Sequence, residues 1–143
     1  RNFYEHLLEQ KVIMDFGENV TFEGNFAIHL QSHYQQLIGD KEIRFGSHSC
    51  ELYFEYDDLE QLSQKLIDAQ VELVHEMREQ PWRQRVIRIY DPDRHIIEIG
   101  ESLEHLSYRL FKEGLSAEDI SKTMMMPSEF VEKSIKFYAE KTD

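Results

Sequence analysis

The residues best suited to chemistry stand on the polar faces of predicted strands. Ile97 and Ile99 point to one face of such a strand and Glu98 points to the other, because successive side chains of a strand alternate. His29 and Glu51 are likewise set opposite aliphatic neighbours. A carboxylate between two isoleucines on a buried strand is solvated, paired with a cation or bound to a metal. The strand pattern leaves these three possibilities open for Glu98.

Glu98 belongs to a stretch, residues 81–101, that predicts two strands joined by a short turn. Val86, Arg88 and Tyr90 alternate with Ile87 and Ile89, which is the period-2 pattern of a strand. Residues 91–94 then interrupt the pattern, since Pro92 cannot donate to a β ladder and the flanking aspartates favour turns. The sequence therefore predicts a hairpin whose second strand carries Glu98.

The chain upstream of this hairpin predicts nearly the same order of elements twice. The first set is a helix within residues 1–10 followed by strands at 11–16, 18–23 and 25–31; the second is a strand at 51–56, a helix from Leu59, a strand at 71–77 and the hairpin. The second set is a complete βαβββ unit, and the first is the same unit without its opening strand. Two copies that agree in order and spacing support a fold more strongly than a single motif does.

The strand pattern also predicts the core. The residues expected to be buried beneath the helices are Phe26, Ile28, Leu30, Leu52, Phe54, Ile87, Ile89, Ile97 and Ile99. Residues 32–49 are polar and irregular, and we interpret them as a connector between the two units.

Residues 104–143 fall outside the repeat and predict three short helices. The first ends at Gly114, a natural residue just past a helix C-terminus, and Pro127 is a good first-turn residue for the third. A helix–turn–helix protein has a similar outline. Here, however, the reading helix presents a set of side chains that is poor for contacts to bases and phosphates: Ser128, Glu129, Glu132, Lys133 and Lys136. We therefore expect a packing appendage.

Composition restricts the class of protein and its partners. A chain of 143 residues with 41% hydrophobic residues suits one domain with a real core. The net charge of −12 disfavours nucleic acid, and no apolar run approaches the roughly 20 residues that cross a bilayer. The single cysteine, Cys50, fits a reducing compartment. We expect a cytoplasmic protein that binds neither nucleic acid nor a membrane.

The hairpin and the repeat resemble the vicinal oxygen chelate superfamily, which includes glyoxalase I, bleomycin-resistance proteins and extradiol dioxygenases. The resemblance rests on Pro81-Trp82, Asp91-Pro92-Asp93 and Ile97-Glu98-Ile99, and it covers residues 1 to about 101. Arg94 stands where the family has Gly, which is costly if that position requires a positive φ.

The resemblance implies an α+β fold. Tandem βαβββ modules, the first lacking its opening strand, form a curved sheet around a cavity, and a small C-terminal helical appendage follows. The implied domain spans residues 1–103, with module one at 1–31, a linker at 32–49 and module two at 50–103; the appendage spans 104–143.

By strand position, the resemblance implies a metal site formed by His29, Glu51 and Glu98, with Glu98 also catalytic. One imidazole and two carboxylates suit Zn²⁺, Ni²⁺, Fe²⁺ or Mn²⁺ in an open site. A dioxygenase is disfavoured, because only one histidine is placed where oxygen activation favours two. The alternative is a hydrogen-bonded His29 and a solvated Glu51. The candidate substrate contacts are Tyr53, Trp82, Arg88 and Tyr90, whose alternative role is packing on the sheet surface, with Arg88 paired to Glu98 or Glu55.

Three functions follow from the resemblance. The first is a divalent-metal-dependent lyase or isomerase of glyoxalase type that acts on a small oxygenated substrate in the cavity between the modules. The second is a metal-free protein that sequesters a ligand, as bleomycin-resistance proteins do, and the third is a regulatory ligand-sensing module. We also expect a homodimer, because the missing opening strand leaves a sheet edge that proteins usually cover.

Overall fold

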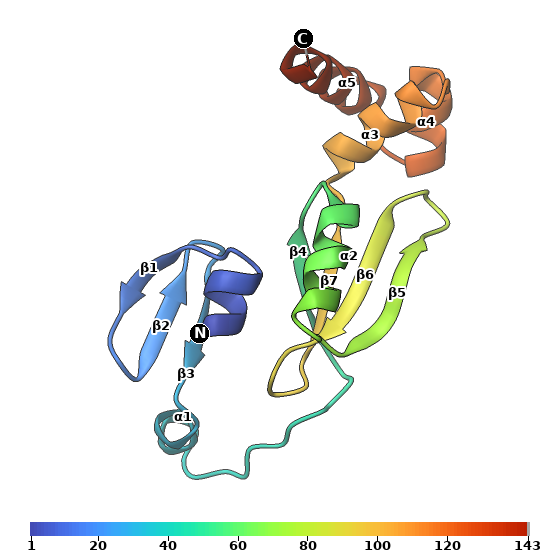
Figure 1. Ribbon diagram of the computed structural model, residues 1–143. Helices are drawn as coiled ribbons and strands as arrows, with labels where there is room; N and C mark the ends of the chain where they lie inside the picture. Colours follow the sequence, from blue (N-terminus) through green and yellow to red (C-terminus); the bar gives the residue numbers. More distant parts are fainter. Residues whose placement is uncertain (143) are drawn as a thin grey trace. The chain divides into compact units, whose positions relative to one another are not determined.

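The computed structural model describes residues 1–142, which form two compact units (Figure 1). Unit 1 comprises Arg1–Cys50 together with the turn Asp91–His95. Unit 2 comprises Glu51–Tyr90 and the described chain from Ile96 onward. The C-terminal helices therefore group with the second predicted module. No described helix is both long enough and apolar enough to cross a membrane.

Unit 1 holds two short helices and a three-stranded antiparallel sheet. Its elements are η1 (Phe3–Leu7), β1 (Val12–Asp15), β2 (Asn19–Phe22), β3 (Phe26–His29) and α1 (Gln31–Leu37), and the strand order is β1-β2-β3. In η1 the Leu8 N–H donates to the carbonyl of Phe3 at 3.0 Å. This hydrogen bond joins residues five apart in sequence, whereas an α-helical bond joins residues four apart. The prediction that residues 1–10 contain no strand is confirmed.

The core of unit 1 is small and aromatic. Tyr4 from η1 and Phe22 from β2 are buried, and the rings of Phe22 and Phe26 stack with their centroids 4.7 Å apart. Phe26 and Ile28 are half-buried, whereas Leu30 is 56% exposed, so its predicted burial is wrong. The strand ends at His29 and Leu30 precedes α1, so the alternation of strand faces stops one residue before it.

Helix α1 lies in the segment expected to be irregular. None of its residues is buried, and no side chain caps its first turn. The sequence does space Leu30, Tyr34 and Leu37 as on one face of a helix, but it offers no capping side chain, and all three residues are exposed.

Unit 2 contains the complete βαβββ module. It is built from β4 (Glu51–Glu55), α2 (Leu59–Asp68), β5 (Leu73–Glu79), β6 (Arg85–Tyr90) and β7 (Ile96–Gly100), with strand order β4-β7-β6-β5. Strands β4 and β7 run parallel, and the other neighbours are antiparallel. The predicted α+β class is confirmed.

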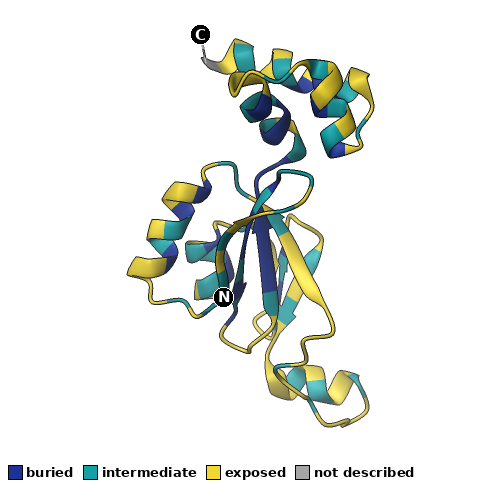
Figure 2. Ribbon diagram, turned by 90° about the vertical axis from the view of Figure 1, so that its right-hand side faces the viewer, coloured by how far each residue is buried: buried dark blue, intermediate teal, exposed yellow. Residues whose placement is uncertain are grey.

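Helix α2 covers one face of this sheet. Asp58 caps it by accepting a hydrogen bond from the Gln61 N–H. The helix buries Leu59, Leu62 and Leu66 against the sheet. The sheet side of this core is formed by four buried residues whose burial was predicted: Ile87, Ile89, Ile97 and Ile99. Figure 2 shows this burial in the central strands. Phe54 is half-buried and Leu52 is 39% exposed, so the predicted burial of Leu52 is wrong. Leu52 lies on the edge strand β4, whereas α2 packs over β6.

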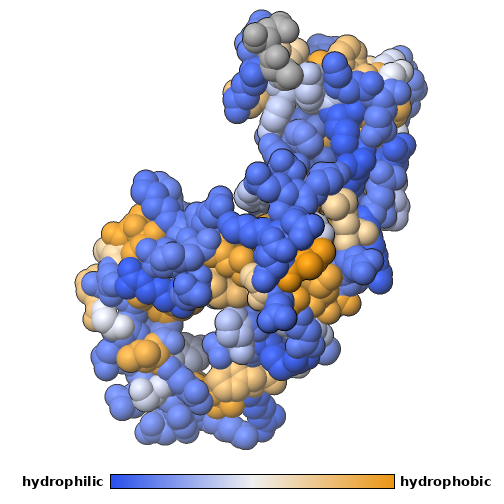
Figure 3. Space-filling model, in the orientation of Figure 1, coloured by the Kyte–Doolittle hydropathy of each residue, from blue (hydrophilic) through white to orange (hydrophobic). Residues whose placement is uncertain are grey.

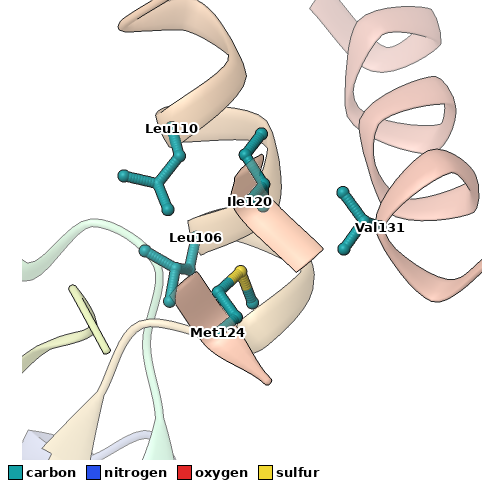
Figure 4. Close-up of a cluster of buried hydrophobic side chains, with 5 residues drawn as sticks. All are labelled: Leu106, Leu110, Ile120, Met124 and Val131. Atoms are coloured by element: carbon teal, nitrogen blue, oxygen red, sulfur yellow. The ribbon is translucent and has the colours of Figure 1, made fainter. Parts of the chain in front are cut away.

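Three helices complete unit 2 and confirm the predicted helical segment. They are α3 (Leu103–Lys112), α4 (Ala117–Met124) and α5 (Ser128–Thr142). They pack around a cluster of buried side chains, Leu106, Leu110, Ile120, Met124 and Val131 (Figure 4). Their outward side is mainly hydrophilic in the view of Figure 3. Exposed ion pairs such as Lys122–Glu118 contribute charge to these helices.

Candidate functional site

The face of the unit 2 sheet opposite α2 carries most of the predicted site residues. Arg88 on β6 lies directly across from Glu98 on β7, which in turn pairs with Tyr53 on β4. His75 on β5 is the cross-strand partner of Arg88. Cross-strand partners present their side chains on the same face, so four neighbouring strands contribute to one polar surface.

The guanidinium of Arg88 joins the two glutamates predicted as metal ligands. Its Nε donates to Glu51 Oε2 at 2.8 Å and its Nη2 to Glu51 Oε1 at 3.2 Å, and Nη2 also donates to Glu98 Oε2. The side chain of Glu98 is 11% exposed and that of Glu51 is 38% exposed. The structure therefore brings Glu51 and Glu98 together on one cation, and the alternative pairing of Arg88 with Glu98 is confirmed.

His75 contacts the same guanidinium. Its Nε2 lies 3.3 Å from Arg88 Nη1, and its Nδ1 lies 2.7 Å from the carbonyl oxygen of Glu76. Both contacts are hydrogen bonds if Nδ1 carries the proton and Nε2 accepts, which is one tautomer of the neutral imidazole. The sequence pattern did not identify His75, because only the pairing of β5 with β6 puts it beside Arg88.

Tyr53 is held by a short chain of hydrogen bonds. Trp82 Nε1 donates to Gln84 Oε1 at 2.9 Å, and Gln84 Nε2 donates to the Tyr53 hydroxyl at 3.0 Å. Burial of the Tyr53 phenol, followed by the charge of Glu55, raises its pKa. Trp82 also packs against the cluster between α3, α4 and α5. This chain orients Tyr53 and ties its position to the helical segment.

The remaining predicted residues, Tyr90 and His29, are not members of this chain of hydrogen bonds. Tyr90 ends β6 and is half-buried, and its N–H donates to the Glu72 carbonyl at 2.9 Å. His29 belongs to unit 1, where its Nε2 lies 3.0 Å from Asn19 Nδ2 and its ring centroid lies 5.6 Å from that of His33. Within either unit, no three His, Cys, Asp or Glu side chains of the described residues gather as a metal site. The shared site of His29, Glu51 and Glu98 stays a prediction.

A second charged cluster lies where β7 meets α3. Glu101 is 1% exposed and accepts hydrogen bonds from the Arg85 N–H, His105 Nδ1 and two nitrogens of Arg109. Burial alone would raise the pKa of Glu101, but these hydrogen bonds outweigh it and lower the pKa to about 2. Sequence reasoning missed this cluster, although the spacing of four residues from Glu101 to His105 and on to Arg109 is a usable signal on a helix.

Comparison with known proteins identifies the family of this chain. Residues 1–104 match the family model described as a glyoxalase-like domain. A protein of unknown function from Agrobacterium tumefaciens str. C58 has a crystal structure with 42% identity and a TM-score of 0.63, over 71% of this chain and 81% of that one. No curated protein matches.

Two further crystal structures share the fold at lower identity. A glyoxalase-related enzyme from Fulvimarina pelagi is 20% identical, with a TM-score of 0.58 over 71% of this chain and 76% of that one. The lactoylglutathione lyase from Agrobacterium tumefaciens is 14% identical, with a TM-score of 0.51 over 71% and 81%. At these identities the likeness concerns the fold alone.

Proposed function

Since this chain belongs to the glyoxalase-like domain family, we propose that it binds a small oxygenated molecule on the polar face of the unit 2 sheet. The observation that carries the proposal is the convergence of Glu51 and Glu98 on one cation, the guanidinium of Arg88. Two carboxylates from adjacent strands that already share a cation have the donor chemistry of a divalent-metal site.

We propose Glu51 and Glu98 as ligands of Zn²⁺, Ni²⁺, Fe²⁺ or Mn²⁺, with His29 as the third ligand. Such an ion supplies Lewis acidity toward neighbouring substrate oxygens. Glu98 is also the proposed catalytic residue, because a carboxylate on this polar face can take a proton from a substrate bound there. The proposed reaction class is that of a lyase or isomerase of glyoxalase type.

The aromatic residues of this face would orient the substrate. Tyr53 offers a hydroxyl whose position is held by Gln84, and Tyr90 lies on the same face of β6 as Arg88. Trp82 contributes through Gln84, since its indole N–H holds the amide that contacts Tyr53. Arg88 has protein acceptors around all three of its nitrogens, so its proposed role as a substrate contact requires those bonds to open.

Metal content of the purified protein tests this function. We expect a bound divalent metal that is lost in His29→Ala and in Glu98→Ala. Glu129→Ala should retain it, because Glu129 is an exposed residue of α5 paired with Lys133. Absence of any bound divalent metal after loading with each of the four ions would end the proposal.

A metal-free binding protein is the second candidate, and the same ion pair favours it. Arg88 already neutralises part of the charge on Glu51 and Glu98, so the two carboxylates do not require a metal. The net charge of −12 suits a cationic, planar ligand. Thermal-shift screening should then show stabilisation by basic aromatic compounds in metal-free protein, and a screen without such stabilisation removes this candidate.

We also propose that the chain forms a homodimer through the open edge of β3. Among the described residues β3 pairs only with β2, whereas its counterpart β7 pairs with both β6 and β4. An edge with unpaired N–H and C=O groups is a ready site for another strand. Sedimentation equilibrium at micromolar concentration should show a dimer, and a strict monomer would contradict this assembly.

A further inference from the structure

The guanidinium of Arg88 contacts both carboxylates that are proposed above as metal ligands. We propose that Arg88 is a resident cation that competes with divalent metals for these two carboxylates, so that a metal enters only when the guanidinium swings away. The inference rests on the metal site proposed above. It adds that the Arg88 guanidinium competes with the metal, which favours the metal-free state of the chain.

The first support is the completeness of the contacts that Arg88 makes. Both oxygens of Glu51 are taken by the fork of Nε and Nη2, and Nη2 also reaches Glu98. Bidentate contacts between a guanidinium and a carboxylate are among the stronger hydrogen bonds in proteins. Nη1 is anchored on the far side by His75. Side chains of three other strands, β4, β5 and β7, therefore hold the guanidinium in this position.

The second support is that the two cations need the same atoms. A divalent metal would bind carboxylate oxygens at about 2.0–2.2 Å. Glu51 Oε1 and Glu98 Oε2 are the oxygens that already accept hydrogen bonds from Nη2. An ion at those oxygens would lie against the guanidinium, and two like charges in contact repel strongly where water is partly excluded. Occupancy by one cation therefore excludes the other.

The third support is the difference in burial. The Arg88 side chain is 25% exposed, so its charged end can rotate toward water while its aliphatic part stays on the sheet. Glu98, at 11% exposure, cannot follow it. Removal of the guanidinium leaves a nearly buried carboxylate without a partner, which is unfavourable until another cation arrives. Loss of Arg88 should therefore increase affinity for metal.

Calorimetric titration of Mn²⁺ and Ni²⁺ into metal-free protein tests the competition. We expect Arg88→Met to bind at least about tenfold more tightly than the wild type, since the carboxylates lose their resident cation. Arg88→Lys should bind close to the wild type, because it keeps the charge. Arg88→Met combined with Glu98→Gln should lose the gain, which assigns the gain to this site. Equal or weaker binding by Arg88→Met would overturn the proposal.

The outcome separates this inference from the proposed function. Metal bound by Arg88→Met but not by the wild type supports the competition and contradicts metal use by the native chain. Tight binding by the wild type with no gain in Arg88→Met supports metal use by the native chain and contradicts the competition. If circular dichroism shows that Arg88→Met does not fold, NMR of the wild type replaces the titration of that variant, with the ¹⁵Nε–H resonance of Arg88 as the probe. That resonance should shift on saturation with Zn²⁺, and an unchanged resonance at saturation would overturn the proposal.

Discussion

The hydroxyl of Tyr4 donates a buried hydrogen bond of 2.7 Å to Oδ2 of Asp91, 87 residues further along the chain. Asp91 also accepts the N–H groups of Asp93 and His95 at Oδ1, at 2.9 and 2.8 Å. One carboxylate thus shapes the turn before β7 and anchors helix η1. Arg94 has φ +65°, so this turn does require the positive φ that a glycine adopts at lower cost.

Replacement of Tyr4 by Phe should destabilise the chain. The change removes the donor and leaves a buried carboxylate oxygen with one partner fewer, which typically costs about 1–3 kcal/mol. Urea denaturation measures the loss in free energy of unfolding. Tyr34→Phe is the control, because Tyr34 is 44% exposed. Equal stability of Tyr4→Phe and the wild type would show that the bond contributes nothing.

Replacement of Ile97 by Ala should create a cavity beneath α2. Ile97 has 0% exposure, and large-to-small changes in a core cost roughly 2–5 kcal/mol. Ile67→Ala is the matched control, since Ile67 of α2 is 60% exposed and should lose far less. Chemical denaturation of both variants gives the comparison. A cost near zero at Ile97 would mean that this face of β7 is not the buried one.

Replacement of Gly100 by Ala should disturb Tyr53. A Cβ at Gly100 would lie 3.0 Å from Gln84 Nε2 and 3.2 Å from the Tyr53 ring and hydroxyl. Overpacking of this kind costs typically about 1–3 kcal/mol. At Gly24 the nearest atom is 3.5 Å away, so Gly24→Ala should be tolerated. The melting temperatures of the two variants test this, and that of Gly100→Ala should be the lower. Similar values would show that Gln84 and Tyr53 move aside at little cost.

The Glu101 cluster should make stability depend on pH in a defined window. The pKa of Glu101 is lowered from 4.5 to about 2, so its stabilisation is present above pH 4.5 and is lost as pH falls toward 2. The hydrogen bond to Glu101 raises the pKa of His105 above 6.5, so that contribution is present below pH 6.5 and is lost as pH rises through the raised pKa. The two contributions overlap between pH 4.5 and 6.5.

The variant Glu101→Gln should therefore differ most from the wild type in that window. Urea denaturation from pH 2 to pH 8 measures the difference in free energy of unfolding, which should shrink toward both ends. Glu118→Gln is the control, since Glu118 is an exposed residue paired only with Lys122 in the contacts described. A difference that is constant across this range would contradict the assigned role of Glu101.

Much of the fold was predictable because it depends on local patterns. The period-2 alternation identified Ile87, Ile89, Ile97 and Ile99 as one buried face, and the repeated order of elements identified the βαβββ module. In the C-terminal segment, Gly114 marked the end of α3 and Pro127 marked the start of α5. These signals act over a few residues, so the amino-acid sequence by itself determines them.

The partners of each polar side chain were decided only by the tertiary structure. Strand alternation put Arg88 and Glu98 on polar faces, but only the pairing of four strands brought Arg88 between Glu51, Glu98 and His75. Leu52 fits the apolar pattern and is still exposed, because alternation tells which face a residue has and not which element covers it. A charge or an apolar face acquires its role from what the fold brings against it, and that depends on contacts between residues distant in sequence.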